Sequence, residues 1–353
     1  MVGSRGRAPA VGRRGGALTF ARKGIACALA TALVAFAGCG EESGDPGAAE
    51  GERLDVALDF YVNPDHAGIL RALDGGHFDD AGLDVELKVP SDPAAPIKQV
   101  AAGEVDLAVS YEPEVLLARE QGLDVVAVAA LVSQPLTSLI ATGNAGVDEV
   151  ADLEGTTVAT AGIPYQATFL DALLDDAGLS DDAVRRVEVG LGLLPAVLSG
   201  RADAMLGGFR NIEGVDLAER GEDPVVLPVD ELGIPTYDEL VLVANGTAVA
   251  SDPEPIRLFL SALERGTRDA VDDPEAATES VLDAGDGLDP DLTAAEVEAT
   301  LPLLQPDGED HPFGHMDSAE WRRFGAFLVD EGLLKQAPDT GAALDNGLLP
   351  SGG

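Results

Sequence analysis

The chain has 353 residues, and its 63 Asp and Glu residues outnumber its 22 Lys and Arg residues, so the formal net charge is −41. Such acidity opposes binding to nucleic acid, whose phosphates require basic partners. It also opposes adhesion to an anionic bilayer through surface charge. We interpret it as a solvated acidic surface that favours solubility.

The N-terminus has the pattern of an export signal. Its first 40 residues contain no acid, and its basic residues are Arg5, Arg7, Arg13, Arg14, Arg22 and Lys23. The apolar run at 24–38 is shorter than the about 20 residues that a transmembrane helix needs. It ends in F-A-G followed by Cys39, which resembles a bacterial lipobox. We predict a lipoprotein signal peptide at 1–38 and lipidation of Cys39. The alternatives are a plain secretory signal or an uncleaved anchor.

The residues after Cys39 are small and polar, so residues 39–53 are predicted to form a flexible tether. Cys27 lies inside the predicted signal, which leaves Cys39 alone in the mature protein, without a disulfide or a Cys metal site. We expect the protein to stand on the outer face of the cytoplasmic membrane. The roughly 300 residues beyond the tether can build two lobes with cores of their own.

Strand and helix patterns alternate along the first part of the folded region. Short β-rich runs occur at 54–58, 83–87, 105–109 and 125–131, and helical patterns occur at 67–73, 97–102 and 114–119. This alternation predicts βαβ units and a largely parallel sheet.

A second α/β series begins near residue 152. Its strands are predicted at 156–160, 187–189, 204–206 and 225–229, with helices at 165–177 and 194–199. An apolar strand at 240–244 and a helix from 252 follow, and the tail carries an apolar stripe of Trp321, Phe324, Phe327 and Leu328 that we assign to the core. We predict lobe I at 54–142 and 241–350, lobe II at 143–240, two chain crossings, and a ligand cleft between the lobes.

Catalytic patterns are sparse. The sequence has neither a nucleophile elbow nor a phosphate-binding loop after a predicted strand. His311 and His315 are four residues apart, but Pro312 and Gly314 intervene, so no helix face can present them to a metal. We therefore predict no catalytic residue, no metal and no cofactor.

Polar and aromatic side chains instead follow several predicted strands. One group is at 59–68, directly after the first strand, and a second is at 110–113. A third group, at 207–213, follows a strand of lobe II, and a fourth, at 233–237, precedes the return crossing. Because clefts form at the carboxyl ends of such strands, we expect these groups to line a binding site.

Several longer segments resemble one family, the ABC-importer binding proteins for thiamine pyrimidine precursors (ThiY-like proteins). The segments are S-D-P-A-A at 91–95, S-Y-E-P-E-V-L-L-A-R at 110–119, Q-P-L-T-S-L at 134–139, Y-D-E-L-V-L-V at 237–243 and P-F-G at 312–314. The resemblance covers about residues 54–335. It implies a type II periplasmic-binding-protein fold, an aminopyrimidine ligand, an ABC permease with its ATPase as partners, and no catalysis. We also expect a monomer.

The resemblance implies the ligand-binding residues Asp59, Phe60, Tyr61, Asn63, His66, Tyr111, Glu112, Gly162, Pro164, Phe209, Glu213 and Tyr237. Aromatic faces would stack on a flat heterocycle, and the Glu213 carboxylate would pair with its amine edge. Asp59, Asn63 and His66 would form hydrogen bonds with the other substituents of the ring. The plainer interpretations are that Asp59 caps a helix, that His66 is structural and that Glu213 is a solvated surface acid.

Three departures from the family pattern widen the choice of ligand. Phe60 replaces the usual Trp, Val62 replaces a common Pro, and Phe209 replaces the usual Tyr, so two polar donors are missing. Another flat heterocycle, flavin-like or purine-like, is therefore an alternative ligand. A receptor that signals is an alternative function. So is a pyrimidine synthase that uses its own His and pyridoxal phosphate, although residues 72–78 lack the Lys of a Schiff base.

Overall fold

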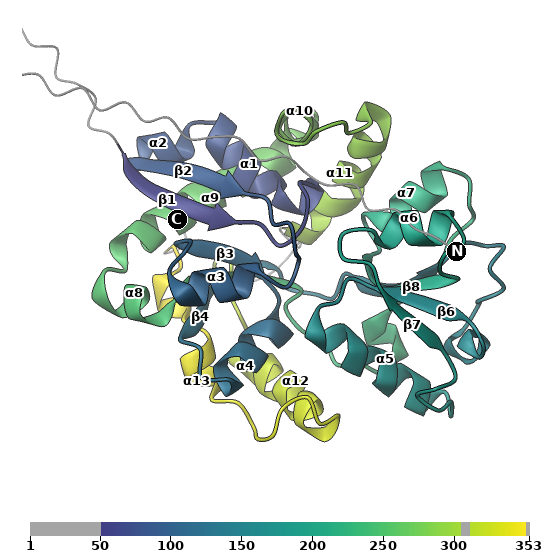
Figure 1. Ribbon diagram of the computed structural model, residues 1–353. Helices are drawn as coiled ribbons and strands as arrows, with labels where there is room; N and C mark the ends of the chain where they lie inside the picture. Colours follow the sequence, from purple (N-terminus) through teal and green to yellow (C-terminus); the bar gives the residue numbers. More distant parts are fainter. Residues whose placement is uncertain (1–50, 305–310, 351–353) are drawn as a thin grey trace, which may run out of the picture. The chain divides into compact units, whose positions relative to one another are not determined.

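A computed structural model describes residues 51–304 and 311–350, which belong to a compact unit spanning Ala49–Gly353. The described residues build two five-stranded mixed sheets, each flanked by helices (Figure 1). The predicted signal peptide, Cys39 and most of the predicted tether lie outside the described residues. The first strand begins at Glu52, so the predicted end of the tether at residue 53 is two residues too late.

The first sheet has the strand order β2-β1-β3-β10-β4. Its strands are β1 (Glu52–Ala57), β2 (Leu83–Lys88), β3 (Leu107–Ser110), β4 (Val125–Val132) and β10 (Leu240–Asn245). Strand β1 is parallel to β2 and β3, whereas β10 runs antiparallel between β3 and β4. The central strand β3 is buried at all four positions, as its apolar run predicts.

The second sheet has the order β7-β6-β8-β5-β9. Its strands are β5 (Thr137–Ala141), β6 (Thr157–Thr160), β7 (Arg185–Glu188), β8 (Ala204–Phe209) and β9 (Val225–Pro228). Strand β6 is parallel to β7 and β8, and β5 is antiparallel to β8 and β9. The two-lobed α/β prediction is thereby confirmed.

The predicted lobe boundary at residue 142 is wrong. Strand β5 ends at Ala141, yet it pairs with β8 and β9 of the second sheet, so the first crossing lies between Val132 and Thr137. The return crossing lies between the short helix η3 (Val229–Leu232) and β10, close to the predicted position. A buried apolar strand fits either sheet, and only its hydrogen-bonding partners decide between them.

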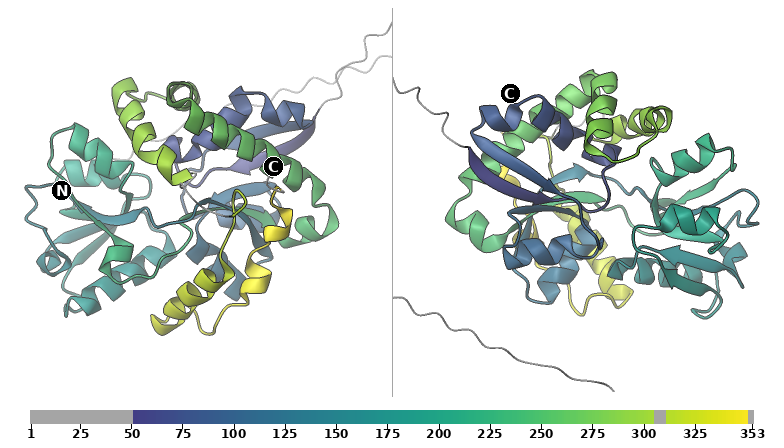
Figure 2. Two further views of the ribbon diagram at one scale, coloured as in Figure 1. Left: turned by 180° about the vertical axis from the view of Figure 1, so that it is seen from behind. Right: turned by 45° about the horizontal axis from the view of Figure 1, so that its top comes forward.

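Helices cover both sheets (Figures 1 and 2). Those of the first lobe are η1 (Pro64–His66), α1 (Ala67–Asp74), α2 (His77–Asp80), α3 (Pro96–Ala102), α4 (Glu112–Glu120), α8 (Gly246–Ser251), α9 (Glu254–Asp272), α10 (Pro274–Ala284), α11 (Pro290–Leu304), α12 (Ser318–Asp330), α13 (Thr340–Ala343) and η4 (Asn346–Leu348). Those of the second lobe are η2 (Val150–Leu153), α5 (Pro164–Asp176), α6 (Leu193–Leu198), α7 (Glu213–Glu219) and η3.

The apolar stripe of α12 lies in the core, as predicted. Trp321, Phe324 and Leu328 are fully buried, and Phe327 packs against the core. The indole N–H of Trp321 donates to the Asp238 carboxylate at 2.6 Å. The last helices of the chain are thereby fastened to the segment that returns from the second lobe.

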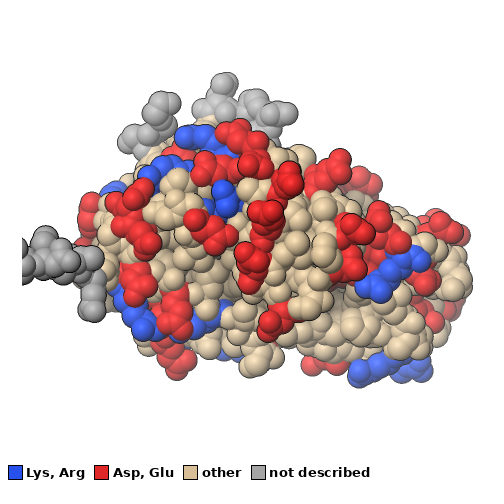
Figure 3. Space-filling model, turned by 90° about the horizontal axis from the view of Figure 1, so that it is seen from above, with Lys and Arg blue, Asp and Glu red and all other residues tan. Residues whose placement is uncertain are grey.

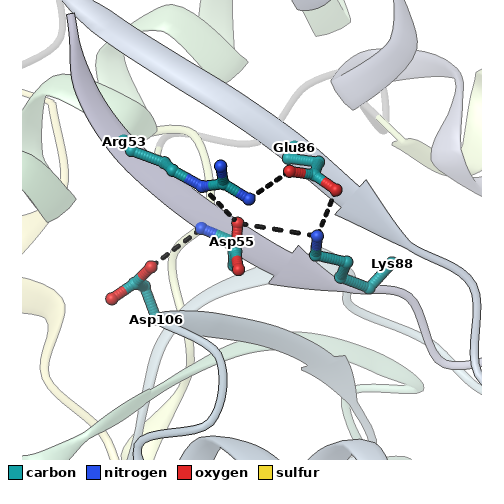
Figure 4. A network of polar contacts seen from close by, with 5 residues as sticks. All are labelled: Arg53, Asp55, Glu86, Lys88 and Asp106. Atoms are coloured by element: carbon teal, nitrogen blue, oxygen red, sulfur yellow. Dashed lines mark hydrogen bonds and ion pairs between the residues drawn. The ribbon is translucent and has the colours of Figure 1, made fainter. Parts of the chain in front are cut away.

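A network of ion pairs lies across the outer strands of the first sheet (Figure 4). Arg53 and Asp55 of β1 contact Glu86 and Lys88 of β2, and the backbone N–H of Asp55 donates to Asp106 at 2.8 Å. The parallel register places these side chains on one exposed face. Exposed pairs add little stability, so the network chiefly covers the sheet edge with charge.

Acidic side chains are spread over the face of the molecule seen in Figure 3, with Lys and Arg in fewer, smaller groups. This agrees with the solvated acidic surface that the composition predicts. Within residues 51–304 and 311–350, no helix combines the length and the apolar character needed to cross a membrane.

Candidate functional site

A cavity lies where strands of both sheets end. Its lining comes from four segments: three follow β1, β3 and β6, and the fourth comprises the end of β8 and the residues after it. The lining residues are Asp59, Phe60, Tyr61, Asn63, Tyr111, Ala161, Ile163, Tyr165, Gln166, Gly207, Phe209, Ile212 and Glu213. The cavity is thus at the carboxyl ends of the strands, as predicted, and it combines aromatic rings with two carboxylates.

Asp59 is held by two buried donors. His66 Nε2 lies 2.8 Å from Asp59 Oδ1, and the Tyr111 hydroxyl donates to Oδ2 at 2.8 Å. His66 Nδ1 accepts from the backbone N–H of Asn63 at 3.3 Å, so Nε2 is the nitrogen that carries the proton. Each Asp59 oxygen keeps a second lone pair, which lets the carboxylate accept a further bond from a ligand.

His66 is therefore a positioning residue and not a contact residue. It is fully buried and does not line the cavity, so the structure places it behind the surface at which the predicted contact with a ring substituent would form. The ring lies behind Asp59 because the short helix η1 is capped by Asn63, whose Oδ1 accepts from the N–H of Asp65 at 2.8 Å. Asn63 itself lines the cavity, as predicted.

Glu213 opens α7 and connects the two lobes. Its Oε2 accepts from the backbone N–H of Phe209 at 2.8 Å, and its Oε1 accepts from the Tyr61 hydroxyl of the first lobe at 3.3 Å. Burial raises the pKa of the Glu213 carboxyl, while the hydrogen bonds from Phe209 and Tyr61 oppose that rise. Only 5% exposed, Glu213 is not the solvated surface acid of the plainer interpretation.

Aromatic rings surround these carboxylates. Phe60 and Tyr61 are tilted neighbours with centroids 4.7 Å apart, and Tyr111 and Tyr165 lie 5.7 Å apart. Phe209 lines the cavity from the second lobe. Rings on several sides can hold a flat heterocycle by stacking.

Besides His66, four predicted residues lie outside the lining: Glu112, Gly162, Pro164 and Tyr237. Glu112 is fully buried and accepts from the backbone N–H of Asp238 at 2.8 Å. Burial and the neighbouring Asp238 carboxylate raise the pKa of Glu112. Glu112 therefore connects α4 to the return crossing and lies away from the cavity where a ligand contact was predicted.

Tyr237 is a core residue. Its ring stacks on Phe324 at 4.7 Å, and its hydroxyl donates to Glu239 at 2.9 Å.

Gly162 and Pro164 shape the lining without being part of it. Gly162 has a φ of +82°, which permits the turn after β6, and Pro164 starts α5.

The turn after β6 also delivers lining residues that sequence reasoning missed, namely Ala161, Ile163, Tyr165 and Gln166. Tyr165 is the first residue of the helix predicted at 165–177, but it was not named as a contact. The turn signal G-I-P at a strand's end could have pointed to them. Gly207 and Ile212 belong to the predicted group at 207–213 but were not named as contacts.

No group of three or more metal-binding side chains is found in the described part of the chain. His311 and His315 pack edge to face, 4.3 Å apart, outside the cavity. No lysine is among the cavity-lining residues in the described ranges. The site thus offers hydrogen bonds and aromatic surface, which suit reversible binding of a small polar ring.

The fold is that of periplasmic binding proteins. A protein from Bordetella bronchiseptica RB50 matches with a TM-score of 0.67 and 20% identity, over 85% of this chain and 96% of that one. The alkanesulfonate-binding protein SsuA from Xanthomonas axonopodis pv. citri matches with a TM-score of 0.66 and 15% identity, over 84% and 99%. The predicted fold class is confirmed.

Sequence comparison places the chain more narrowly. The model of the family described as NMT1/THI5 like matches residues 63–277. The formylaminopyrimidine-binding protein of Halalkalibacterium halodurans is 34% identical over 81% of this chain and 87% of its own length. A Haemophilus influenzae protein named for thiamine biosynthesis is 34% identical over 81% and 89%. The chain therefore belongs to the NMT1/THI5-like family.

A more distant relative carries a different name. The 4-amino-5-hydroxymethyl-2-methylpyrimidine phosphate synthase of Legionella pneumophila is 25% identical over 84% of this chain and 92% of its own length. The family thus includes proteins named for binding and proteins named for synthesis, and the choice between these functions depends on the site.

Proposed function

We propose that this chain is the exported, lipid-anchored binding component of an ABC importer and that it captures an aminopyrimidine precursor of thiamine. One observation carries the proposal: two buried carboxylates, Asp59 and Glu213, face an aromatic-lined cavity between two lobes. The name of the Halalkalibacterium halodurans relative supports the ligand class.

The chemistry of the cavity suits that ligand. An aminopyrimidine presents an exocyclic amine beside a ring nitrogen, and a carboxylate that already accepts protein donors can accept from this edge as well. Phe60, Tyr61 and Phe209 offer faces for the ring, which adds about 0.5–1.5 kcal/mol beyond area burial. Hinge motion at the two crossings would close the lobes on the ligand.

Synthesis of a pyrimidine fits the site less well. The histidine that would supply ring atoms, His66, is fully buried behind Asp59. A pyridoxal phosphate cofactor needs a lysine for its Schiff base, and no lysine lines the described cavity. We expect purified protein mixed with pyridoxal phosphate to show no aldimine absorbance. A stable band of that kind would argue for an enzyme.

Isothermal titration tests the ligand class. We expect one-to-one binding of an aminopyrimidine and a rise in melting temperature, because a ligand that binds only the folded state stabilises it. Flavins and purines complete the panel, because the replacements at Phe60 and Phe209 leave those rings as alternatives. Mass spectrometry of ligand carried through native purification identifies the molecule without assuming its class. Absence of binding to every flat heterocycle would overturn the proposal.

The anchor and the partner need separate tests. We expect Cys39→Ala to move the protein from the membrane fraction to the soluble exported fraction without changing ligand affinity. Unchanged membrane association would argue for an uncleaved anchor.

Co-purification of a permease and an ATPase with the ligand-bound protein supports import, whereas ligand-dependent binding to a membrane sensor supports the signalling alternative. Size-exclusion chromatography checks the expected monomer.

A further inference from the structure

Gln166 is a polar residue of the cavity that neither the family resemblance nor its position relative to a strand end identified. It is in the first turn of α5, lines the cavity and is only 2% exposed. Its Oε1 accepts a hydrogen bond from the backbone N–H of Ala161 at 2.8 Å. Because the oxygen is held in this way, the side chain cannot flip, and the Nε2 amino group has a defined direction.

Gly207 of β8 makes room for that amino group. Its φ is +104°, and a Cβ built on it would come within 2.2 Å of Gln166 Nε2. Gly207 lines the same cavity. A side chain at position 207 would thus displace the amide. The position of the Gln166 amide at the cavity wall therefore depends on the glycine.

The Gln166 amino group is a donor without an acceptor. In the part of the chain that the structure describes, Oε1 accepts from the Ala161 N–H, and no hydrogen bond from Nε2 to a protein oxygen is found. Two other donors of the lining are already used, because Tyr61 donates to Glu213 and Tyr111 donates to Asp59. Nε2 is not one of the fully enclosed side-chain atoms that lack a partner. It is open to the cavity, where an acceptor on the ligand, or water, can meet it.

The carboxylates and the amide therefore have complementary tasks. Asp59 and Glu213 accept hydrogen bonds and match the amine edge of an aminopyrimidine. The acceptors that remain on the ligand are its ring nitrogens and the oxygen of a hydroxyl or carbonyl substituent. Only the substituent oxygen distinguishes one aminopyrimidine from another, and it is the acceptor considered for Gln166.

We propose that Gln166, held by Ala161 and given space by Gly207, is a specificity-determining residue that donates a hydrogen bond to a substituent oxygen of the bound heterocycle. This inference rests on the proposed function, since it assumes that an aminopyrimidine occupies the cavity. It predicts selection for rings with an oxygen-bearing substituent over rings with an alkyl group in its place.

Titration of the full-length protein with two probes tests the inference: 4-amino-5-hydroxymethyl-2-methylpyrimidine and its oxygen-free analogue 4-amino-2,5-dimethylpyrimidine. We expect the wild type to bind the first probe about 10-fold more tightly or better, which is the effect of one unpaired buried donor. If the wild type binds neither probe, the proposed function fails. If it binds both equally, the role of Gln166 is overturned while the proposed function stands.

Variants then assign the preference to the amide. Gln166→Glu keeps an oxygen for the Ala161 N–H but replaces the donor by an acceptor, and we expect the preference for the hydroxymethyl probe to disappear at pH 8. Gln166→Met removes the donor at similar volume and covers the case in which the new charge prevents binding. Gln121→Glu, an exposed position outside the cavity, controls for added charge. Wild-type preference in either folded variant would overturn the inference.

Gly207→Ala provides an independent measurement, because it leaves Gln166 in place but occupies the space of its amide. We expect the same loss of preference as in Gln166→Met, and no further loss when the two changes are combined. A Gly207→Ala protein that retains the full preference would show that the amide does not depend on this glycine.

Discussion

Glu213 links the ligand cavity to the contact between the lobes. It accepts from Phe209 in its own lobe and from Tyr61 in the other. A ligand amine that binds this carboxylate would join two donors already in place. The side chain is thus fixed before ligand arrives, which lowers the ordering cost of binding.

We predict that Glu213→Gln weakens aminopyrimidine binding by about 10- to 150-fold, the effect of a lost charge-assisted hydrogen bond of about 1.5–3 kcal/mol. The amide can replace only one of the two acceptor oxygens. Titration calorimetry measures the change, and urea unfolding checks that the variant is folded. Glu219→Gln, exposed at the end of the same helix, should bind as the wild type does. Unchanged affinity in Glu213→Gln would remove this residue from the site.

At the scale of elements, Glu239 fastens the two crossings to each other. Its Oε2 accepts from the backbone N–H groups of Leu136 and Thr137, each at 2.7 Å, and its Oε1 accepts from the Thr137 hydroxyl at 2.9 Å. Leu136 and Thr137 end the outgoing crossing, and Glu239 ends the returning one. The Glu239 carboxylate therefore ties the two chain passages together.

We predict that Glu239→Gln lowers the free energy of unfolding by about 2–4 kcal/mol, because an amide nitrogen cannot accept from the buried donors that converge on this side chain. Denaturant unfolding measures the loss. Glu231→Gln, an exposed change in the same returning segment, serves as the matched control. Equal stability of the two variants would contradict a stabilising role for the hydrogen bonds of Glu239 between the two crossings.

Helices α1 and α9 pack so closely that glycine is needed at the contact. A Cβ at Gly266 would lie 2.4 Å from the carbonyl oxygen of Gly68 and 2.5 Å from the backbone nitrogen of Ala72. These are backbone atoms of a packed helix, which cannot move aside as a flexible side chain can.

We predict that Gly266→Ala destabilises the protein by about 1–3 kcal/mol through overpacking, although alanine is favoured over glycine by about 1 kcal/mol in a helix interior. Thermal and denaturant unfolding measure the sign. Ser261→Ala, on the exposed face of α9, should be neutral or slightly stabilising, because only helix propensity acts there. A stabilised Gly266→Ala protein would mean that the helices separate at little cost.

At the scale of the whole folded unit, a buried polar bridge joins the lobes beside the cavity. Asn211 Nδ2 of the second lobe donates to Asp65 Oδ1 and to the Thr300 hydroxyl of the first lobe, each at 2.8 Å. Helix α11 carries Thr300 and Glu296 towards α7, where Asp216 lies (Figures 1 and 2). Several acidic side chains therefore lie close together at the contact between the lobes.

Burial raises the pKa of Asp65 to about 7, against the hydrogen bond from Asn211. Burial and the Asp216 carboxylate raise the pKa of Glu296 to about 8. Both groups hold protons in the folded state that the unfolded chain releases near pH 4. Their contribution to stability is thus fully favourable below about pH 4 and is lost as the pH rises through 7 to 8.

We predict that Asp65→Asn stabilises the protein relative to the wild type as the pH rises from about 4 to about 8, by up to about 4 kcal/mol. The asparagine keeps an oxygen for Asn211 and cannot ionise. Urea unfolding at pH 5 and pH 8 measures the difference, with the exposed change Asp80→Asn as control. Parallel pH profiles for Asp65→Asn and the wild type would contradict a buried proton at this position.

Much of this protein is determined by local sequence. The alternation of strands and helices predicts two α/β lobes, and the residues after β1, β3 and β8 predict the edge at which the cavity lies. Asp59, Tyr111 and Glu213 are cavity residues that come within four residues of a strand end, and that position depends on chain geometry alone. The apolar stripe of α12 likewise determines its place in the core.

Only the tertiary structure decided the remaining assignments. The sheet that β5 joins depends on hydrogen bonds to strands more than 60 residues away in sequence, which no local pattern encodes. Tyr237 packs on Phe324 of a distant helix, His66 turns behind Asp59, and Gln166 reaches the cavity because Gly207 leaves space for it. The sequence shows which side chains stand near a strand's end, but long-range packing determines which of them face the cavity.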